Sequence, residues 1–315
     1  MRPGEQQLKA EVTRGGVEHP PGNEGPSYRD RVGEIIDGKY ELLSVIDAGG
    51  QGVVYRARDL RDNDTVAIKM LKDSVARSVE WRERMFREAQ ALAVLSGTSA
   101  VRVLDQRWTS DGVLCLVMEL LQGADLETVL GRLSRRGLSF PVDALELVFE
   151  PVATTLERAH EKGILHRDLK PANIFVADSP NGPAVKLLDF GFAKFVRMRS
   201  FTRDGTIAGS PSYIAPETWM GFGSRLDRRI DVYGLAAVLF RALGGRPPFL
   251  GSDLAELYQR VIADPRPSLR ALRPELPGDV DAWVEQALAV DREQRFSSVR
   301  AMFTALRVAL GMDVD

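Results

Sequence analysis

The segment His166-Arg167-Asp168-Leu169-Lys170-Pro171-Ala172-Asn173 is the most informative part of the sequence. It brings together an acid that can accept a hydroxyl proton, a lysine that can hold a phosphate and an amide that can ligate a metal. Residues 153–165 before it have helical periodicity, and residues 174–176 after it are typical of a strand. The polar segment is therefore predicted to be a loop held at both ends by packed elements, a common position for catalytic groups. The alternative is a solvated turn that happens to have this composition.

Three further motifs accompany this loop along the chain. A glycine-rich stretch covers residues 47–54, Val66-Ala67-Ile68-Lys69 ends a strand-like segment, and Asp189-Phe190-Gly191 follows the loop. In this order the four segments resemble the eukaryotic-type (Hanks-type) protein kinase family, here of the bacterial serine/threonine kind. The resemblance covers about residues 38–310. Jointly the motifs are highly specific, although any one of them alone would be weak.

The patterning of residues 34–312 agrees with the α+β, two-lobed fold that this resemblance implies. A small lobe, about 34–120, is expected to hold a five-stranded antiparallel sheet and one helix, over residues 40–46, 53–58, 65–70, 79–95 (the helix), 101–108 and 113–119. Within the helix, Val79, Phe86, Ala89, Leu92 and Ala93 recur at helical spacing. Glu88 is one turn before Leu92 and is predicted to lie on the inward face. A larger lobe, about 121–312, is predicted to be mainly helical, over residues 125–135, 142–162, 231–244, 252–263, 280–290 and 297–310.

Residues 1–33 are rich in Gly, Pro, Glu and Arg and contain few large apolar side chains, so they are predicted to form a disordered tail. A docking or regulatory arm is the alternative.

The chain has 315 residues, 44% of them hydrophobic, and a formal net charge of −2, so nothing suggests binding to nucleic acid. No signal peptide or membrane span is predicted, and we expect a cytoplasmic protein, either a stand-alone kinase or a piece of a longer chain. The single cysteine, Cys115, is expected to be a packed small hydrophobe.

Lys69 ends an otherwise apolar strand, where an unpaired ammonium would be costly to bury. The resemblance implies that it holds the α- and β-phosphates of ATP and pairs with an acid on the following helix. Glu88 is the best candidate for that acid, ahead of Glu80 and Glu83. A surface lysine and a solvated helix glutamate are the bland alternatives.

The resemblance also assigns roles within the loop. Asp168 would be the catalytic base and Lys170 would contact the γ-phosphate, a pattern that favours Ser/Thr substrates. Asn173 and Asp189 would hold Mg²⁺, with Mn²⁺ as an alternative, because a hard ion prefers oxygen ligands. A capping or turn aspartate is the alternative for Asp189.

The glycine-rich stretch departs from the family pattern at its first position, where Asp47 stands in place of glycine, while Gly49 and Gly52 match. A carboxylate near the nucleotide repels phosphate, so weaker ATP binding is expected. The residues that the resemblance implies for the nucleotide site are Ala48, Gly49, Gly50, Gln51, Gly52, Val54, Ala67, Lys69, Met118, Glu119, Leu121, Asp125, Asn173, Phe175 and Asp189. A second departure lies at residues 97–101, in a loop that helps to dock the small-lobe helix, so the coupling of the lobes is expected to differ.

Residues 191–217 resemble an activation segment. Ser210 would hydrogen-bond Asp168 and Lys170, and Thr202 or Thr206 is the expected phosphorylation site, with Arg167 as the partner of the phosphate. Unmodified loop threonines are the alternative.

Several other residues match structural positions of the family. Leu92, Leu104, His166 and Phe190 would stack across the two lobes, Asp231 would brace the loop backbone, and Glu217 would pair with Arg295. His160 is interpreted as structural, since a lone histidine on a packed helix usually is.

The resulting hypothesis is a Ser/Thr protein kinase that transfers the ATP γ-phosphoryl group to protein substrates and autophosphorylates its own activation loop through a transient homodimer. Asp47 and the loop at 97–101 leave a second hypothesis open, a pseudokinase-like scaffold that binds nucleotide with little or no catalysis. A small-molecule phosphotransferase is disfavoured by residues 210–217, which resemble a peptide-docking segment.

Overall fold

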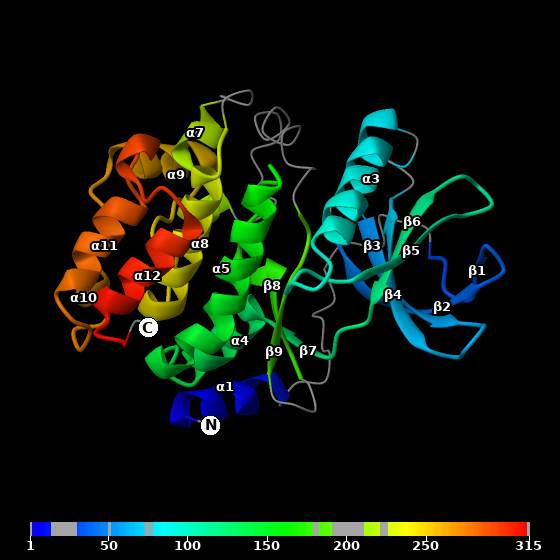
Figure 1. Ribbon diagram of the computed structural model, residues 1–315, viewed down its shortest axis with the longest axis horizontal. Coiled ribbons are helices and arrows are strands. Elements are labelled where there is room, and N and C mark those ends of the chain that lie inside the picture. The colour runs from blue at the N-terminus through cyan, green and yellow to red at the C-terminus, as the bar shows by residue number, and fades with distance from the viewer. Residues whose placement is uncertain are drawn as a thin grey trace.

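The structure, a computed structural model, has a sheet lobe and a helical lobe, on the right and the left of Figure 1. It describes residues 2–13, 30–49, 52–72, 76, 78–178, 183–190, 211–220 and 226–313.

The small lobe is built on an antiparallel sheet with the strand order β1-β2-β3-β4-β6-β5. Its strands are β1 (Ile35–Ile36), β2 (Tyr40–Ala48), β3 (Gly52–Asp59), β4 (Thr65–Leu71), β5 (Val103–Trp108) and β6 (Leu114–Glu119). The predicted count of five strands is wrong by one, because the two-residue β1 pairs with β2 at the edge of the sheet. A pair of residues is too short to show the alternation on which strand prediction depends.

The centre of this sheet is strongly apolar. In β6 the side chains from Leu114 to Val117 are all buried, and Cys115 is fully enclosed, as expected for a packed cysteine. Burial raises the pKa of the Cys115 thiol to about 12, so this thiol is unreactive at neutral pH.

Helix α3 (Val79–Val94) packs against β5 and β6. Of the five residues at helical spacing, Ala89 and Leu92 are buried, whereas Val79 and Phe86 are 61% and 48% exposed and Ala93 is also exposed. The buried face runs through Met85, Glu88 and Leu92, so the predicted inward position of Glu88 is confirmed.

The large lobe contains a small antiparallel sheet and a set of helices. The sheet has the order β7-β8-β9, and its strands are β7 (Gly123–Asp125), β8 (Ile174–Ala177) and β9 (Ala184–Leu187). The helices are α4 (Leu126–Arg135), α5 (Leu145–Glu161), α7 (Pro216–Trp219), α8 (Arg229–Gly244), α9 (Leu254–Ala263), α10 (Leu269–Leu272), α11 (Asp279–Ala287) and α12 (Val299–Ala309), with single 3₁₀ turns η1 (Val142–Ala144), η2 (Pro171–Asn173), η3 (Pro211–Tyr213) and η4 (Arg292–Gln294). The short elements α7, α10 and β7 were not predicted. None of the described helices has the length and apolar character required to cross a bilayer.

Helix α8 forms the centre of the large lobe, since every residue from Ile230 to Leu243 is buried. It contacts α10, α11 and α12, and α12 also packs on α5. Asp231 therefore places a carboxylate in the interior of the lobe, where it requires hydrogen-bond partners.

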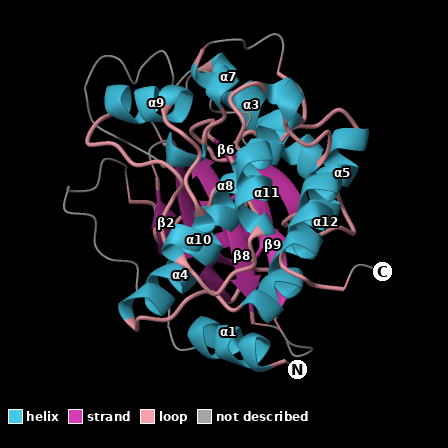
Figure 2. Ribbon diagram, turned by 90° about the vertical axis from the view of Figure 1, so that its left-hand side faces the viewer, coloured by secondary structure: helices cyan, strands magenta, loops and turns pink. Residues whose placement is uncertain are grey.

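The prediction of a disordered tail over residues 1–33 is wrong for Pro3–Thr13, which form helix α1. This helix packs on the large lobe against α4, η1 and β7, at the bottom of Figures 1 and 2. Its anchors are Leu8 and Val12, which are 0% and 2% exposed. Two apolar residues within a polar segment give too weak a pattern to reveal a helix that depends on tertiary contact.

Candidate active site

Lys69 on β4 lies between two carboxylates that come from distant parts of the chain. Its Nζ is 2.7 Å from Oε1 of Glu88 on α3 and 2.6 Å from Oδ1 of Asp189, two residues beyond β9. The predicted ion pair with Glu88 is therefore present, and neither Glu80 nor Glu83 takes that position, because they pair with Arg84 and Arg87. The same lysine draws Asp189 of the large lobe toward the small lobe.

The electrostatics of this cluster follow from two carboxylates sharing one ammonium. Burial works to lower the pKa of Lys69, but Asp189 and Glu88 outweigh it and hold the pKa well above its ordinary value. Burial raises the pKa of Glu88 to about 7, an effect that Lys69 only partly offsets. Burial also acts to raise the pKa of Asp189, but the attraction of Lys69 is larger and lowers it. Glu88 is thus the carboxylate of this pair that takes up a proton first.

The carboxylate of Asp231 holds the start of the loop at 166–173 by hydrogen bonds to its backbone. Its Oδ2 accepts a hydrogen bond from the backbone N of His166 and its Oδ1 accepts one from the backbone N of Arg167, both at 2.8 Å. The ring Nε2 of His160 on α5 lies 2.8 Å from Oδ2 of the same carboxylate, consistent with a structural role for that histidine. Burial alone would raise the pKa of Asp231, but the hydrogen bonds from His160 and from the loop lower it. The buried carboxylate holds Arg167 in a left-handed conformation, with φ of 64°.

The acid and the lysine of the loop lie side by side. Nζ of Lys170 is 3.3 Å from Oδ2 of Asp168. The side-chain amide nitrogen of Asn173 donates to the backbone oxygen of Asp168 at 2.7 Å, which fixes the orientation of that amide. Three of the residues predicted to carry the chemistry are therefore held together within one loop of the chain.

His166 connects this loop to the segment that carries Asp189. Its Nδ1 accepts from the backbone N of Asp168 at 3.3 Å, so the other ring nitrogen, 2.9 Å from the oxygen of Leu188, is the donor. The backbone N of Leu188 in turn donates to the oxygen of Asn173 at 2.8 Å. Burial lowers the pKa of His166, in agreement with a neutral ring that accepts on one side and donates on the other. Asp168, Asn173 and Asp189 are thus brought together by backbone hydrogen bonds.

The predicted stack across the lobes is only partly present. The rings of His166 and Phe190 lie 4.7 Å apart, and both side chains are 0% exposed. Leu92 is also buried, but Leu104 is 42% exposed, so its assignment to a buried stack is wrong. A register irregularity in β5 between Val103 and Asp105 accounts for the difference, because a bulge turns the residue between them away from its expected side.

Comparison with known proteins agrees with this geometry, since a family described as protein kinase domain matches residues 40–305. The chain belongs to the protein kinase family. It is 36% identical over 277 residues to the probable serine/threonine-protein kinase PknB of Corynebacterium glutamicum, covering 85% of this chain and 42% of that protein. It is 33% identical over 309 residues to the serine/threonine-protein kinase Pkn1 of Myxococcus xanthus, covering 98% of this chain and 43% of that protein. The chain therefore spans less than half the length of these curated bacterial relatives.

Solved structures give the same result for the fold. The crystal structure of the PknI kinase domain of Mycobacterium tuberculosis superposes with a TM-score of 0.70 at 28% identity, covering 89% of this chain and 99% of that chain. The matched family region, 40–305, lies inside the predicted kinase domain and excludes helix α1.

The residues expected to bind nucleotide occupy neighbouring strands on both sides of the connection between the lobes. Val54 is paired with Lys69 across β3 and β4, Ala67 with Met118 across β4 and β6, and Asp125 with Phe175 across β7 and β8.

In the glycine-rich stretch, the backbone N of Gly49 donates to the oxygen of Gly52 at 3.0 Å, and Oδ1 of Asp47 accepts from the backbone N of Ala48 at 2.9 Å. A Cβ at Gly52 would lie 2.5 Å from the backbone oxygen of Met70, so glycine is required there for close approach of the strands. Gly50 and Gln51 lie outside the described residues.

The connection between the lobes is fastened by Glu119, a role that its sequence context did not reveal. Its Oε1 accepts from the backbone N of Arg102 at 2.7 Å and lies 2.6 Å from Nζ of Lys186 on β9. The side chain of Glu119 therefore ties the end of β6 to both lobes. Asp125, at the end of β7, accepts from the backbone N of Thr128 at 2.9 Å and caps α4.

The loop at residues 97–101 differs from the family pattern in sequence but still contacts the large lobe. The backbone N of Val101 donates to the oxygen of Leu187 at 3.0 Å, and the backbone N of Leu187 donates to the oxygen of Ser99 at 2.7 Å. The backbone N of Ser99 also donates to the hydroxyl of Thr155 on α5 at 3.1 Å. The loop that follows α3 is thus joined to the large lobe by hydrogen bonds of its own backbone, two to Leu187 and one to the Thr155 hydroxyl, which do not depend on the side chains at 97–101.

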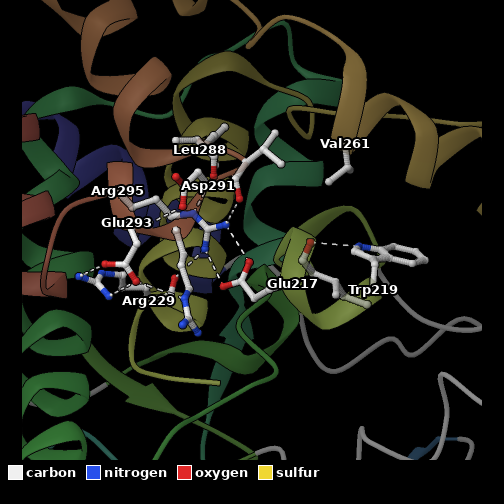
Figure 3. Close-up of polar contacts among 12 residues, drawn as sticks. Glu217, Trp219, Arg229, Val261, Leu288, Asp291, Glu293 and Arg295 are labelled. Carbon is white, nitrogen blue, oxygen red and sulfur yellow. Dashed lines mark hydrogen bonds and ion pairs between the residues drawn. The ribbon is translucent and has the colours of Figure 1, made fainter. Parts of the chain in front are cut away.

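The expected activation segment is described only at its end. Thr202, Thr206 and Ser210 lie outside the described residues. Glu217 on α7 forms a bidentate ion pair with Arg295, with both N–O distances at 2.8 Å, as Figure 3 shows. The Arg295 side chain is 0% exposed and its guanidinium lies 5.0 Å from the ring centre of Tyr233. The predicted pairing of Glu217 and Arg295 is confirmed, and it anchors the end of the segment to the helical lobe.

Two residues of this site could ligate a divalent metal. Asp189 supplies a carboxylate, and the donation by the nitrogen of Asn173 fixes which end of its amide carries the oxygen. Among the described residues no cluster of three or more His, Cys, Asp or Glu side chains could hold a metal by itself. Two protein oxygen ligands suit a hard ion such as Mg²⁺, because phosphate oxygens of the nucleotide would supply further ligands. Membership of the family implies the use of ATP and a divalent metal in general.

Proposed function

We propose that this chain is a serine/threonine protein kinase that transfers the γ-phosphoryl group of ATP to Ser and Thr hydroxyls of protein substrates. The observation that carries the proposal is the convergence of Lys69, Glu88 and Asp189, with N–O distances of 2.7 and 2.6 Å, beside the braced loop that holds Asp168 and Lys170. These residues come from both lobes, so their meeting has no explanation in the packing of either lobe alone. Because ATP is the donor, we propose a cytoplasmic location.

In this proposal Asp168 orients the acceptor hydroxyl and takes its proton, and Lys170, 3.3 Å away, neutralises charge on the transferred group. Lys69 holds the α- and β-phosphates, while Glu88 keeps the ammonium in place. Asn173 and Asp189 would hold Mg²⁺, or Mn²⁺ in its place. The bound ion would neutralise the negative charge of the phosphates. In this mechanism the residues position the reactants and stabilise charge, and none of them forms a covalent bond to the transferred group.

A pseudokinase-like scaffold is not favoured. Its support was Asp47 and the loop at 97–101, and that loop is joined to β9 and α5 by hydrogen bonds. The named relatives are serine/threonine-protein kinases, and the full set of ionic residues that the family uses is present.

The experiment compares phosphoprotein formation by wild type and Asp168→Asn, with Mg²⁺, labelled ATP and a mixed protein substrate. Asp313→Asn, on an exposed residue near the end of the described chain, is the matched control. We expect the Asp168→Asn variant to lose at least about 100-fold in rate while the control keeps full activity. Equal incorporation by wild type and Asp168→Asn, or none by either, would count against the proposal.

We further propose autophosphorylation at Thr202 or Thr206, with Arg167 as the partner of the phosphate, in a transient homodimer. Support comes from Arg167, whose backbone is fixed by Asp231 beside the catalytic aspartate. Mass spectrometry of protein incubated with ATP should place phosphate within residues 200–206. Phosphate confined to other segments would contradict this assignment.

A further inference from the structure

Helix α1 lies against the large lobe beneath α4 and β7, outside the part of the chain that the kinase family covers (Figures 1 and 2). Its two apolar anchors, Leu8 and Val12, stand one helical turn apart and are 0% and 2% exposed. Both belong to the main apolar core of the protein. The face of the large lobe that receives them is therefore apolar where these two side chains are covered.

The receiving face is also matched in charge. The side chain of Glu11 is only 3% exposed and forms an ion pair with Arg136, the residue that follows α4. Nη1 of Arg132, one turn earlier on α4, donates to the backbone oxygen of Glu11 at 2.5 Å. A carboxylate that is buried without such partners is strongly unfavourable, so this face selects an acid at this position of the helix.

The start of α1 fits closely against η1. The backbone N of Gly4 donates to Oδ2 of Asp143 at 2.9 Å, so an acid of the large lobe satisfies a helix N-terminus 139 residues away in sequence. A Cβ at Gly4 would lie 2.5 Å from Cβ of Pro141. This face therefore also selects a residue without a side chain at the start of the helix.

These contacts are specific but few. A helix of 11 residues has marginal stability by itself, and only two apolar side chains anchor it. Burying these two side chains contributes about 3–6 kcal/mol, less than the roughly 11–22 kcal/mol lost when 11 backbone residues are ordered, so docking also depends on the polar contacts of Glu11 and Gly4. Undocking of this helix would expose the face that it covers.

We propose that this face, formed by Arg132 of α4, Arg136 just after it, Pro141, Asp143 of η1 and the neighbouring strand β7, is a docking groove for an amphipathic helix. Helix α1 is its intramolecular occupant, and it can exchange. The pattern that the groove recognises is a small residue at the helix start, two apolar residues four apart, and an acid just before the second, as in Gly4, Leu8, Glu11 and Val12. A partner protein that presents a helix of this pattern would bind when α1 leaves.

The test uses the full chain and a fluorescein-labelled peptide of residues 2–13, without nucleotide, so its outcome is independent of the proposed catalysis. The variant Leu8→Asp/Val12→Asp undocks α1 but leaves the groove unchanged. We expect fluorescence anisotropy to show at least tenfold tighter peptide binding to this variant than to wild type, because the tethered α1 competes at a high effective concentration. Circular dichroism and Tm verify that the variant is folded. Equal binding to both proteins, or no binding to the folded variant, would overturn the proposal.

Exchanging the charges of Arg136 in the protein and Glu11 in the peptide tests whether the peptide binds in this groove. Arg136→Glu, added to the undocked variant, should weaken the peptide at least tenfold, and a peptide with Glu11→Arg should recover most of the loss. Arg135→Glu, on the exposed side of the same helix, is the matched control and should change binding by no more than about twofold. Failure of the exchanged peptide to recover affinity would show that the peptide binds elsewhere, and the proposal would fall.

Discussion

Nζ of Lys69 lies 2.6 Å from Oδ1 of Asp189, although 120 residues separate them in sequence. The same ammonium is 2.7 Å from Glu88, so one lysine joins the sheet, helix α3 and the large lobe. A nucleotide with its metal would compete for this ammonium and this carboxylate at once. The arrangement explains why the charges of the two lobes converge even without a ligand.

Replacement of Lys69 by methionine should lower phosphotransfer by at least about 100-fold, because the phosphates lose their principal positive partner. Thermal unfolding should remain cooperative, with Tm within a few degrees of wild type at pH 6. Lys39→Met, at a half-exposed surface ion pair with Asp37, is the control and should leave both activity and Tm unchanged. A collapse of the Lys69→Met variant into an unfolded state would show that this lysine is structural.

Glu88→Gln should change how stability depends on pH. The pKa of Glu88 is about 7 in the folded protein, above the ordinary value of 4.5, so the folded state binds more protons than the unfolded state between these values. The contribution of Glu88 to stability is therefore largest at low pH and is lost as pH rises through about 7. The free energy of unfolding of wild type minus that of Glu88→Gln should fall from pH 5.5 to 8, no more steeply than about 1.4 kcal/mol per pH unit. The lowered pKa of His166 gives a pH dependence of the opposite sign, but this histidine is common to both proteins and cancels in the difference. A difference that is flat in pH would contradict the assignment.

Asp231→Asn should destabilise the protein by about 2–4 kcal/mol, because a buried charged acceptor of the bonds from His166 and Arg167 is lost. Since the pKa of Asp231 is lowered, its stabilising effect is complete above pH 4 and decreases only as the carboxylate is protonated in stronger acid. Urea denaturation at pH 7 measures the difference, and Asp264→Asn, on an exposed residue, should be neutral. Stability equal to wild type would mean that the loop does not depend on this brace.

Arg295→Lys should cost about 3–5 kcal/mol, because a lysine cannot form the two parallel bonds to Glu217 and leaves a buried carboxylate poorly paired. Arg260→Lys is a matched control, since its i,i+4 pair with Glu256 is exposed to solvent and should contribute little to stability. Chemical denaturation of both variants tests the contrast. Similar losses for the two substitutions would refute the distinction between the buried and the surface pair.

Asp47→Gly should tighten ATP binding several-fold, because it removes a carboxylate from the glycine-rich stretch and frees the backbone N of Ala48 from its bond to that side chain. Titration with a fluorescent ATP analogue gives the affinity. Asp62→Asn, in the exposed turn after β3, controls for a general change in charge. An affinity that stays the same or becomes weaker would refute our explanation of this departure from the family pattern.

The sequence predicted those parts of the site that local motifs determine. The pairs Lys69 with Glu88 and Glu217 with Arg295 were expected from motif positions, and both are present. The contact between Lys186 and Glu119 was not expected, because neither residue stands in an unusual local context. Contacts of that kind depend on how two distant elements approach each other.

The wrong sequence predictions also arise from contacts between distant elements and from local irregularities. Leu104 was placed inward by resemblance, whereas the irregularity in β5 leaves it exposed. Helix α1 was missed because its stability comes from partners such as Asp143, more than a hundred residues away. Local pattern identifies a helix only where its apolar face is long enough to be recognised without its receptor.

The single, fully enclosed Cys115 has a practical consequence. Its thiol has a pKa of about 12, so maleimide reagents at neutral pH will leave the native chain unlabelled. A cysteine introduced at an exposed position can therefore carry a spin label or a dye without prior removal of the natural one. Distances between probes on the two lobes, or between α1 and α4, become measurable in otherwise unaltered protein.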